Sequence, residues 1–129
     1  MRERSVVLDA SALLAVAHGE PGATAVAPHL ESAAMSAVNW TEVIESRIKR
    51  GILVGEVRAA ASEAGVSIVP LDAAQAELAA ELRTRTEHRG LSLADRACLA
   101  LARSLNLPAM TADRSWDGLD VGVEIQMIR

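Results

Sequence analysis

Residues 5–19 have the sequence SVVLDASALLAVAHG, and this stretch sets the expectation for the whole fold. Its first four residues, Ser5 to Leu8, form a β-branched and apolar run of the kind found in buried strands. Asp9 ends the run, and an Ala/Leu-rich helix is predicted from about Ser11 to His18. Gly19 is suited to end that helix, because glycine readily adopts the left-handed conformation that follows a helix C-terminus. A strand followed at once by a helix is typical of a parallel α/β fold.

The remainder of the chain repeats this alternation of short apolar runs and longer helical patterns. Further strands are predicted at residues 34–36, 66–69 and 109–111, with a half-exposed edge strand within 121–127. Helices are predicted at residues 20–30, with an interruption near Pro28, and at 40–50, 54–64, 72–86 and 92–105. Asn39, Asp72 and Ser92 are the expected N-caps of three of these helices. The pattern indicates one doubly wound α/β domain over residues 1–129.

Composition excludes several classes of protein. The chain has 129 residues, of which 50% are hydrophobic, and it contains one cysteine. These values argue against a disordered chain, a disulfide framework and a cysteine-based zinc site. The formal net charge is −4 and the only aromatic residues are Trp40 and Trp116, so neither a broad basic face nor base stacking is expected to drive nucleic-acid binding.

No stretch of the sequence is long and uncharged enough for a membrane-spanning helix, which needs about 20 residues. Arg2 and Arg4 followed by the apolar residues 6–17 imitate a signal peptide, but Asp9 interrupts the apolar core. We therefore predict a cytoplasmic protein that makes no contact with a membrane.

Carboxylates recur where ligands bind in open α/β sheets, beyond the carboxyl ends of the strands. Asp9 directly follows the first strand, Glu42 lies in the first turn after the second, and Asp113 lies two residues past the strand at 109–111. Asp95 lies in the first turn of the helix that leads to that strand. Helix capping explains any one of these acids taken alone, because helix N-termini favour carboxylates. Asp9 alone, directly after a buried strand, is expected to have no such structural role.

Several carboxylates at one sheet edge would repel one another. At 4–6 Å each pair costs roughly 3–4 kcal/mol at an effective dielectric constant of about 20. Protonation or a divalent cation would relieve this repulsion. A set of oxygen ligands suits Mg²⁺ or Mn²⁺, and such an ion activates water and binds phosphate oxygens. The implied chemistry is phosphodiester hydrolysis.

Five segments, taken in order, resemble the PIN-domain ribonucleases, specifically the VapC-type toxins of type II toxin–antitoxin pairs. They are VLDASALLA (7–15), EPGA (20–23), SAVNWTEV (36–43), LSLADRACLALA (91–102) and TADR (111–114). The resemblance implies a single PIN-like domain with a parallel five-stranded sheet flanked by helices on both faces. It also implies that Asp9, Glu42, Asp95 and Asp113 bind Mg²⁺ or Mn²⁺ and position the attacking water. By the same resemblance, Ser11 and Thr111 belong to the cofactor site and orient these carboxylates.

The function implied by the resemblance is that of an endoribonuclease toxin. Such toxins cleave single-stranded or looped RNA, often tRNA, and leave 3′-hydroxyl and 5′-phosphate ends. They usually form homodimers and are inhibited by an antitoxin protein whose tail covers the pocket. Because the chain is acidic, phosphate contacts must come from local cations, and a solvated helix face is the alternative role for each candidate. The candidates are Arg47, Lys49, Arg50, Arg83, Arg85 and Arg89.

Three alternatives stay open at the level of sequence. A haloacid-dehalogenase-like phosphatase would use Asp9 as its nucleophile, but Ser11 stands where a second Asp is expected. A receiver-like signalling domain would accept phosphate at Asp72, but it expects paired acids near the first strand and a lysine near the last. The third alternative is a non-catalytic module that binds protein.

Overall fold

Strand β1 (Val6–Leu8) lies at the centre of a parallel five-stranded sheet with the order β3-β2-β1-β4-β5. The protein is seen in a computed structural model that describes residues 3–129. The other strands are β2 (Ala33–Ser36), β3 (Ser67–Val69), β4 (Ala109–Thr111) and β5 (Ile125–Met127), and each neighbouring pair is parallel. The predicted parallel five-stranded sheet is confirmed. The edge strand is shorter than the alternation over 121–127 suggests, since only its last part pairs with β4.

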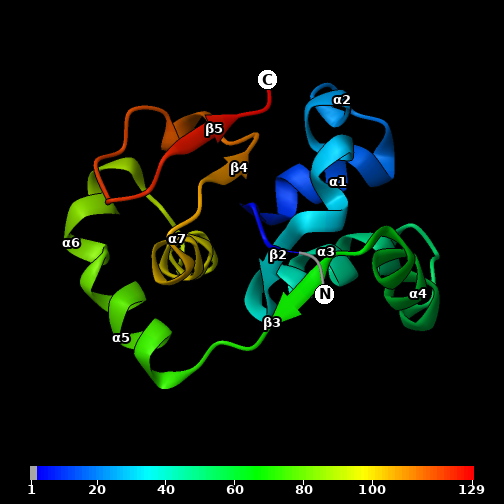
Figure 1. The fold of residues 1–129 in the computed structure, drawn as a ribbon, viewed down its shortest axis with the longest axis horizontal. Coiled ribbons are helices and arrows are strands. Elements are labelled where there is room, and N and C mark those ends of the chain that lie inside the picture. Colours follow the sequence, from blue (N-terminus) through cyan, green and yellow to red (C-terminus); the bar gives the residue numbers. More distant parts are fainter. Residues whose placement is uncertain (1–2) are drawn as a thin grey trace.

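Helices cover both faces of the sheet, as predicted. They are α1 (Ala10–His18), α2 (Ala23–Val26), α3 (Ala37–Lys49), α4 (Val54–Ala64), α5 (Ala73–Glu81), α6 (Arg83–Thr86) and α7 (Leu93–Leu105), with 3₁₀ turns η1 (Ala27–Ser32), η2 (Glu87–Arg89) and η3 (Arg114–Trp116). Figure 1 shows α1, α2 and α4 on one side of the sheet and α5, α6 and α7 on the other. Val6 and Leu8 face the first group, whereas Val7 faces the core that contains α7. This alternation follows from the two-residue period of a strand.

Two predicted helix boundaries are wrong. Ser36, not Asn39, caps α3, because its hydroxyl accepts a hydrogen bond from Val38 N (3.2 Å) and the helix already begins at Ala37. The helix predicted over 72–86 breaks at Leu82 into α5 and α6. The hydroxyls of Thr84 and Thr86 donate to backbone carbonyls three and four residues earlier, and such bonds compete with regular helix geometry.

Other predicted boundaries are confirmed. Asp72 caps α5, and Ser92 caps α7 in a capping box with Asp95. The segment after Gly22 forms the short helix α2 and then η1, with the interruption at Pro28 expected from the missing proline N–H. Among the described residues, no helix is long and apolar enough to cross a membrane.

The strand order places a topological switch point between β1 and β4. From β1 the chain first adds β2 and β3 on one side and then β4 and β5 on the other. Ligands of open α/β sheets bind where the order reverses in this way, beyond the carboxyl ends of the two strands. Helix α3 contacts both α1 and α7, so it lies across this same region. The order also differs from the 2-1-3-4-5 order of receiver-like folds, which removes that alternative.

Candidate active site

Asp9 lies at the end of β1, and its carboxylate accepts three hydrogen bonds. Oδ1 accepts from Ser11 Oγ (2.7 Å) and from Ala12 N (2.9 Å), and Oδ2 accepts from Thr111 Oγ1 (2.5 Å). The bond from Ala12 N makes Asp9 the N-cap of α1. The expectation that Asp9 has no structural role is therefore wrong. Because α1 starts directly after the strand, the residue between them must provide an acceptor for the free N–H groups of the first turn.

The Asp9 carboxyl is buried, with 5% of its residue surface exposed. The pKa of this carboxyl is raised from 3.8 to about 6, chiefly by burial and to a smaller extent by the Asp95 carboxylate. The hydrogen bonds from Thr111, Ser11 and Ala12 act in the opposite direction. No cationic side chain of residues 3–129 contributes to the shift of this pKa. The site therefore holds a buried carboxylate that hydrogen bonds stabilise but that no cationic side chain of the described residues neutralises.

Ser11 and Thr111 tie the end of β1 to the end of β4. The two hydroxyl oxygens lie 3.4 Å apart, and each contacts a different oxygen of Asp9. Ser11 Oγ also accepts from Ala112 N (2.9 Å), and Thr111 Oγ1 accepts from Asp113 N (3.0 Å). The two hydroxyls thus fix the orientation of the Asp9 carboxylate and connect it to the backbone of Asp113.

Glu42 and Asp95 come from different helices and act on one another. Glu42 is exposed on α3 and accepts a hydrogen bond from Asn39 Nδ2 (3.3 Å). Partial burial raises its pKa, and the carboxylates of Asp95 and Glu45 raise it further. Asp95 completes the capping box of α7, since its Oδ2 accepts from Ser92 N (2.8 Å). Because Asp95 raises the pKa of both Asp9 and Glu42, these three carboxylates share one electrostatic environment.

Asp113 follows β4, and its carboxylate caps the next turn of the chain, η3. It is exposed, and its Oδ1 accepts from Ser115 N (2.9 Å) and Ser115 Oγ (2.7 Å), which caps η3. Arg89 donates to the carbonyl oxygens of Ser115 (3.0 Å) and Asp117 (2.7 Å) and so anchors the same loop. Asp113 is connected to Asp9 through Thr111 rather than by direct contact.

A divalent cation fits the donor chemistry of this region. All the candidate ligands are oxygens, the repulsion among Asp9, Glu42 and Asp95 favours a cation, and oxygen ligands suit Mg²⁺ and Mn²⁺. Within residues 3–129, however, no three His, Cys, Asp or Glu side chains form a group that could hold a metal ion. The donor atoms and charges of these residues thus suit a hard cation. Their side chains, however, do not form a complete set of metal ligands.

Asn39 is the residue of this region that the sequence pattern assigns wrongly. It is 1% exposed and lies between α3 and α7, where its amide nitrogen donates to Glu42 Oε1 and to Ala94 O (3.1 Å). The available signal is its spacing: an amide three residues before a glutamate lies on the same face of a helix.

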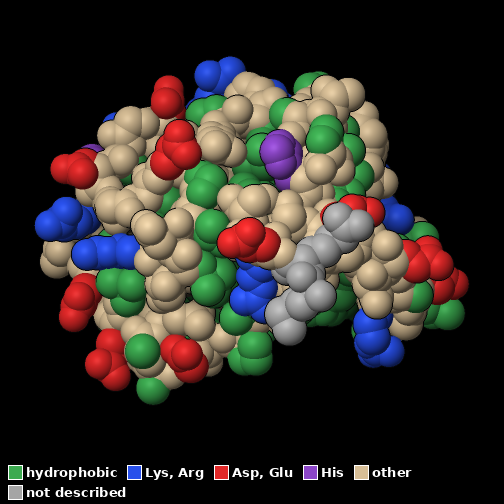
Figure 2. Space-filling view, in the orientation of Figure 1, with side chains coloured by type: hydrophobic (Ala, Val, Ile, Leu, Met, Phe, Trp, Pro, Cys, Tyr) green, Lys and Arg blue, Asp and Glu red, His purple; other side chains and the backbone are tan. Residues whose placement is uncertain are grey.

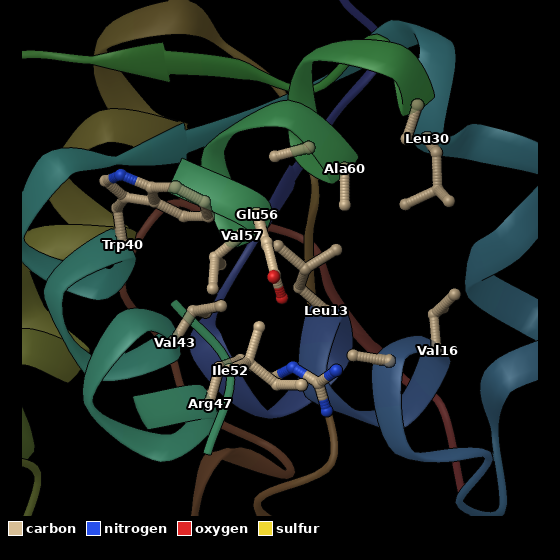
Figure 3. Close-up of a pocket in the computed structure, with 13 residues that line it drawn as sticks. Leu13, Val16, Leu30, Trp40, Val43, Arg47, Ile52, Glu56, Val57 and Ala60 are labelled. Carbon is tan, nitrogen blue, oxygen red and sulfur yellow. The ribbon is translucent and has the colours of Figure 1, made fainter. Parts of the chain in front are cut away.

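Residues of α3 line two surface hollows. An apolar hollow of about 220 Å³ is enclosed by α1, α3 and α4, and none of the four acids lines it. Figure 3 shows Leu13, Ile52 and Val57 around this hollow, with the charged ends of Arg47 and Glu56 reaching into it. A second, open hollow is lined by Glu42, Glu45, Ser46 and Lys49.

The fold and the site define a doubly wound α/β protein with an acidic region at its topological switch point. The PIN domain family model matches residues 6–121, and the chain belongs to that family. This assignment excludes the phosphatase alternative. Nucleases of the family generally use divalent metal ions.

Solved structures show the same fold. A toxin–antitoxin complex from Klebsiella pneumoniae is similar with a TM-score of 0.80 and 23% identity, covering 97% of this chain and 98% of that one. DNA-bound VapBC from Salmonella typhimurium is similar with a TM-score of 0.71 and 17% identity, over 98% and 99% of the two chains. Mycobacterium tuberculosis VapC20, described as a Sarcin-Ricin loop cleaving toxin, has a TM-score of 0.62 and 22% identity, over 91% and 98%. No curated protein sequence matches the chain.

Proposed function

We propose that the chain is a Mg²⁺- or Mn²⁺-dependent endoribonuclease and the cytoplasmic toxin of a VapC-type toxin–antitoxin pair. The observation that carries this proposal is the buried carboxylate of Asp9 at the switch point of a PIN fold, uncompensated by any cation and close enough to Asp95 to be affected by its charge. The similarity to M. tuberculosis VapC20, a toxin that cleaves the Sarcin-Ricin loop, supports RNA as the substrate class.

The residues have distinct tasks in this proposal. Asp9, Glu42, Asp95 and Asp113 would hold the metal ion, directly or through water. The ion, when bound, supplies an activated water and neutralises charge on the scissile phosphate. Ser11 and Thr111 fix the Asp9 carboxylate through their hydroxyls, so that its orientation does not have to be established when a ligand arrives.

RNA would have to be bound by local cations. Figure 2 shows acidic and basic side chains interspersed on one face of the molecule, without a continuous basic band among the residues it displays. Lys49 lines the same open hollow as Glu42, which makes it the best-placed candidate for a phosphate contact. Arg89 is less suited, because two backbone carbonyls already engage its guanidinium group.

The test is RNA cleavage by the purified chain in Mg²⁺ or Mn²⁺, compared with Asp9→Asn. We expect this variant to lose activity by about 100-fold or more, since one precisely placed charge or donor is commonly worth that much. Asp72→Asn is the matched control, because Asp72 also follows a strand and caps a helix. It lies between β3 and α5 rather than between β1 and α1. It should cleave RNA like the unmodified chain.

Three other outcomes would contradict parts of the proposal. Undiminished cleavage by Asp9→Asn would exclude the proposed site. Hydrolysis of small phosphoesters without RNA cleavage would exclude the proposed substrate. A folded chain that cleaves neither would favour the non-catalytic binding module.

We also propose that the partner is an antitoxin protein and that its apolar helical segment binds the hollow in Figure 3. Similar structures from K. pneumoniae and S. typhimurium are toxin–antitoxin complexes, which supports this class of partner. The hollow is mostly apolar, and Arg47 and Glu56 provide one charge of each sign for a charged residue beside the apolar face of such a segment. A homodimer is part of the same proposal, and light scattering that showed a monomer at micromolar concentration would contradict it.

A further inference from the structure

Asn39 joins the two helices that carry Glu42 and Asp95. It lies in the first turn of α3 and is 1% exposed. The same amide nitrogen donates to Glu42 Oε1 (3.3 Å), on its own helix, and to Ala94 O (3.1 Å), on α7. Ala94 directly precedes Asp95. One NH₂ group therefore contacts the Glu42 carboxylate and the backbone next to the second acid.

The orientation of this amide is determined by its partners. A carboxylate and a carbonyl both accept, so the nitrogen must face them and Oδ1 must point away. Oδ1 is buried and has no hydrogen-bond partner among the described residues. A buried acceptor without a partner is unfavourable, and an apolar side chain of the same size would avoid it. Packing therefore does not account for an amide at this position, whereas its two donated hydrogen bonds do.

Glu42 needs such a restraint. It is exposed on α3, its side chain has several rotatable bonds, and the like charge of Asp95 favours conformations that turn away into solvent. The bond from Asn39 opposes this movement and holds Glu42 on the side of α3 that contacts α7.

We propose that Asn39 is a positioning residue that holds the Glu42 carboxylate beside Asp95, so that the two helices present their oxygens together to a divalent cation. This inference rests on the proposed metal-dependent function. Asn39 acts through Glu42 and does not itself contact the ion. Its role resembles that of outer partners that orient the ligands of a metal site.

The test is Mn²⁺ binding to the purified chain without RNA, measured by electron paramagnetic resonance, with Asn39→Leu as the variant. Leucine has the same branching as asparagine, with two methyl groups in place of the amide oxygen and nitrogen, and donates no hydrogen bond. We expect Mn²⁺ affinity to fall about 10-fold or more, as is typical when an outer partner of a metal ligand is removed. RNA cleavage should need correspondingly more Mn²⁺ and should approach the unmodified rate at saturating metal.

Gln75→Met is the matched control. Gln75 is also a buried amide (6% exposed) in the first turn of a helix, with Nε2 donating to Pro70 O (3.3 Å) and Oε1 without a partner among the described residues. It lies on α5, a helix that carries none of the four acids. Gln75→Met should have a comparable effect on the melting temperature and none on Mn²⁺ affinity. An equal loss of Mn²⁺ affinity in both variants would show a general structural effect and overturn the inference.

A double-mutant cycle with Glu42→Gln tests whether Asn39 acts through Glu42. Asn39→Leu should weaken Mn²⁺ binding in the unmodified chain and change it less than about twofold in the Glu42→Gln background. The same loss in both backgrounds, or unchanged affinity in Asn39→Leu, overturns the inference. If Asn39→Leu does not fold, Asn39→Ser replaces it in the same cycle, because its shorter side chain cannot span both contacts.

The failure of this inference can be distinguished from failure of the proposed function. If the chain shows the expected Mn²⁺ pattern but cleaves no RNA, the nuclease proposal falls and the role of Asn39 stands. If it cleaves RNA but Mn²⁺ binding is absent or insensitive to Asn39→Leu, the role of Asn39 falls.

Discussion

At the scale of single residues, the Asp9 carboxylate caps a helix and is also the acid to which we assign a chemical task. Its Oδ1 caps α1, while Oδ2 accepts from Thr111 on β4. Capping stabilises the fold, but burial of the charge destabilises it, and burial has the larger effect on the pKa. A buried carboxylate with a strongly raised pKa is a common feature of functional sites.

The first prediction concerns the pH dependence of stability. Because the pKa of Asp9 is about 6 in the folded chain and near 3.8 when exposed, the folded chain retains a proton that the unfolded chain has lost between these pH values. This retained proton stabilises the folded chain by up to about 3 kcal/mol. The stabilisation is fully present below about pH 4 and is lost as pH rises through about 6. In Asp9→Asn this loss is absent, so the stability of the variant relative to the unmodified chain should rise by up to about 3 kcal/mol as pH rises from about 4 through 6.

Urea denaturation in the presence of a metal chelator, at several pH values, measures this difference. Asp72→Asn serves as the control, because Asp72 is exposed and caps α5. A stability difference between Asp9→Asn and the unmodified chain that does not change with pH would contradict the prediction.

At the scale of elements, α7 connects stability to the site. Ser92 and Asp95 form a capping box, in which Asp95 N donates to Ser92 Oγ (3.2 Å) and Ser92 N donates to Asp95 Oδ2 (2.8 Å). The cap fixes the first turn of the helix that carries Asp95. The Asp95 carboxylate takes part only in the bond that the backbone N–H of Ser92 donates.

Ser92→Ala should therefore separate the contribution of the cap to stability from the contribution of Asp95 to activity. We expect the free energy of unfolding to fall by about 1 kcal/mol, as for loss of an N-cap side chain. RNA cleavage should remain within about threefold of the unmodified chain, because the bond from Ser92 N to Asp95 is retained, whereas Asp95→Asn should be inactive. Urea denaturation and RNA cleavage at 25 °C measure the two effects.

Ser104→Ala is the control for the same helix. Its hydroxyl donates to Ala100 O (2.8 Å) within the helix, and alanine is favoured at such positions. A loss of activity in Ser92→Ala as large as in Asp95→Asn would mean that the hydroxyl itself belongs to the site.

At the scale of the whole molecule, the acids and the apolar hollow occupy different places. The acids follow the strands at the switch point, and the hollow is formed by α1, α3 and α4. Helix α3 contributes to both, through Glu42 and through Arg47. Binding of an antitoxin and cleavage of RNA should therefore be separable by substitution.

Ala60→Glu tests this separation. Ala60 is exposed and lines the hollow, so a glutamate there should not unfold the chain but would place a charge against an apolar partner segment, beside Glu56. We expect inhibition by the cognate antitoxin to weaken about 10-fold or more, with unchanged RNA cleavage by the toxin alone. Ala59→Glu, on the exposed neighbouring residue outside the hollow, is the matched control. Equal inhibition of both variants would place the antitoxin elsewhere.

The local patterns of the sequence were sufficient to predict the elements and the fold class. The apolar run ending at Leu8, the alternation of strands and helices, and the caps Asp72 and Ser92 depend on neighbours within a few residues. Periodicity and capping are local effects, so they can be read without knowing which segments pack together. The same patterns placed all four acids near strand ends or helix starts.

Only the tertiary structure decided which of these acids meet and what holds them. Thr111 reaches Asp9 across 102 positions of the chain, and Asn39 meets Ala94 across 55. The packing of α3 against α7 brings Glu42 and Asp95 into one electrostatic environment, while the carboxylate of Asp113 accepts a hydrogen bond from Ser115 N. Burial and charge coupling depend on distances between segments that are remote in sequence. No local pattern contains those distances, and for this reason the role of Asn39 and the raised pKa of Asp9 emerge only from the folded chain.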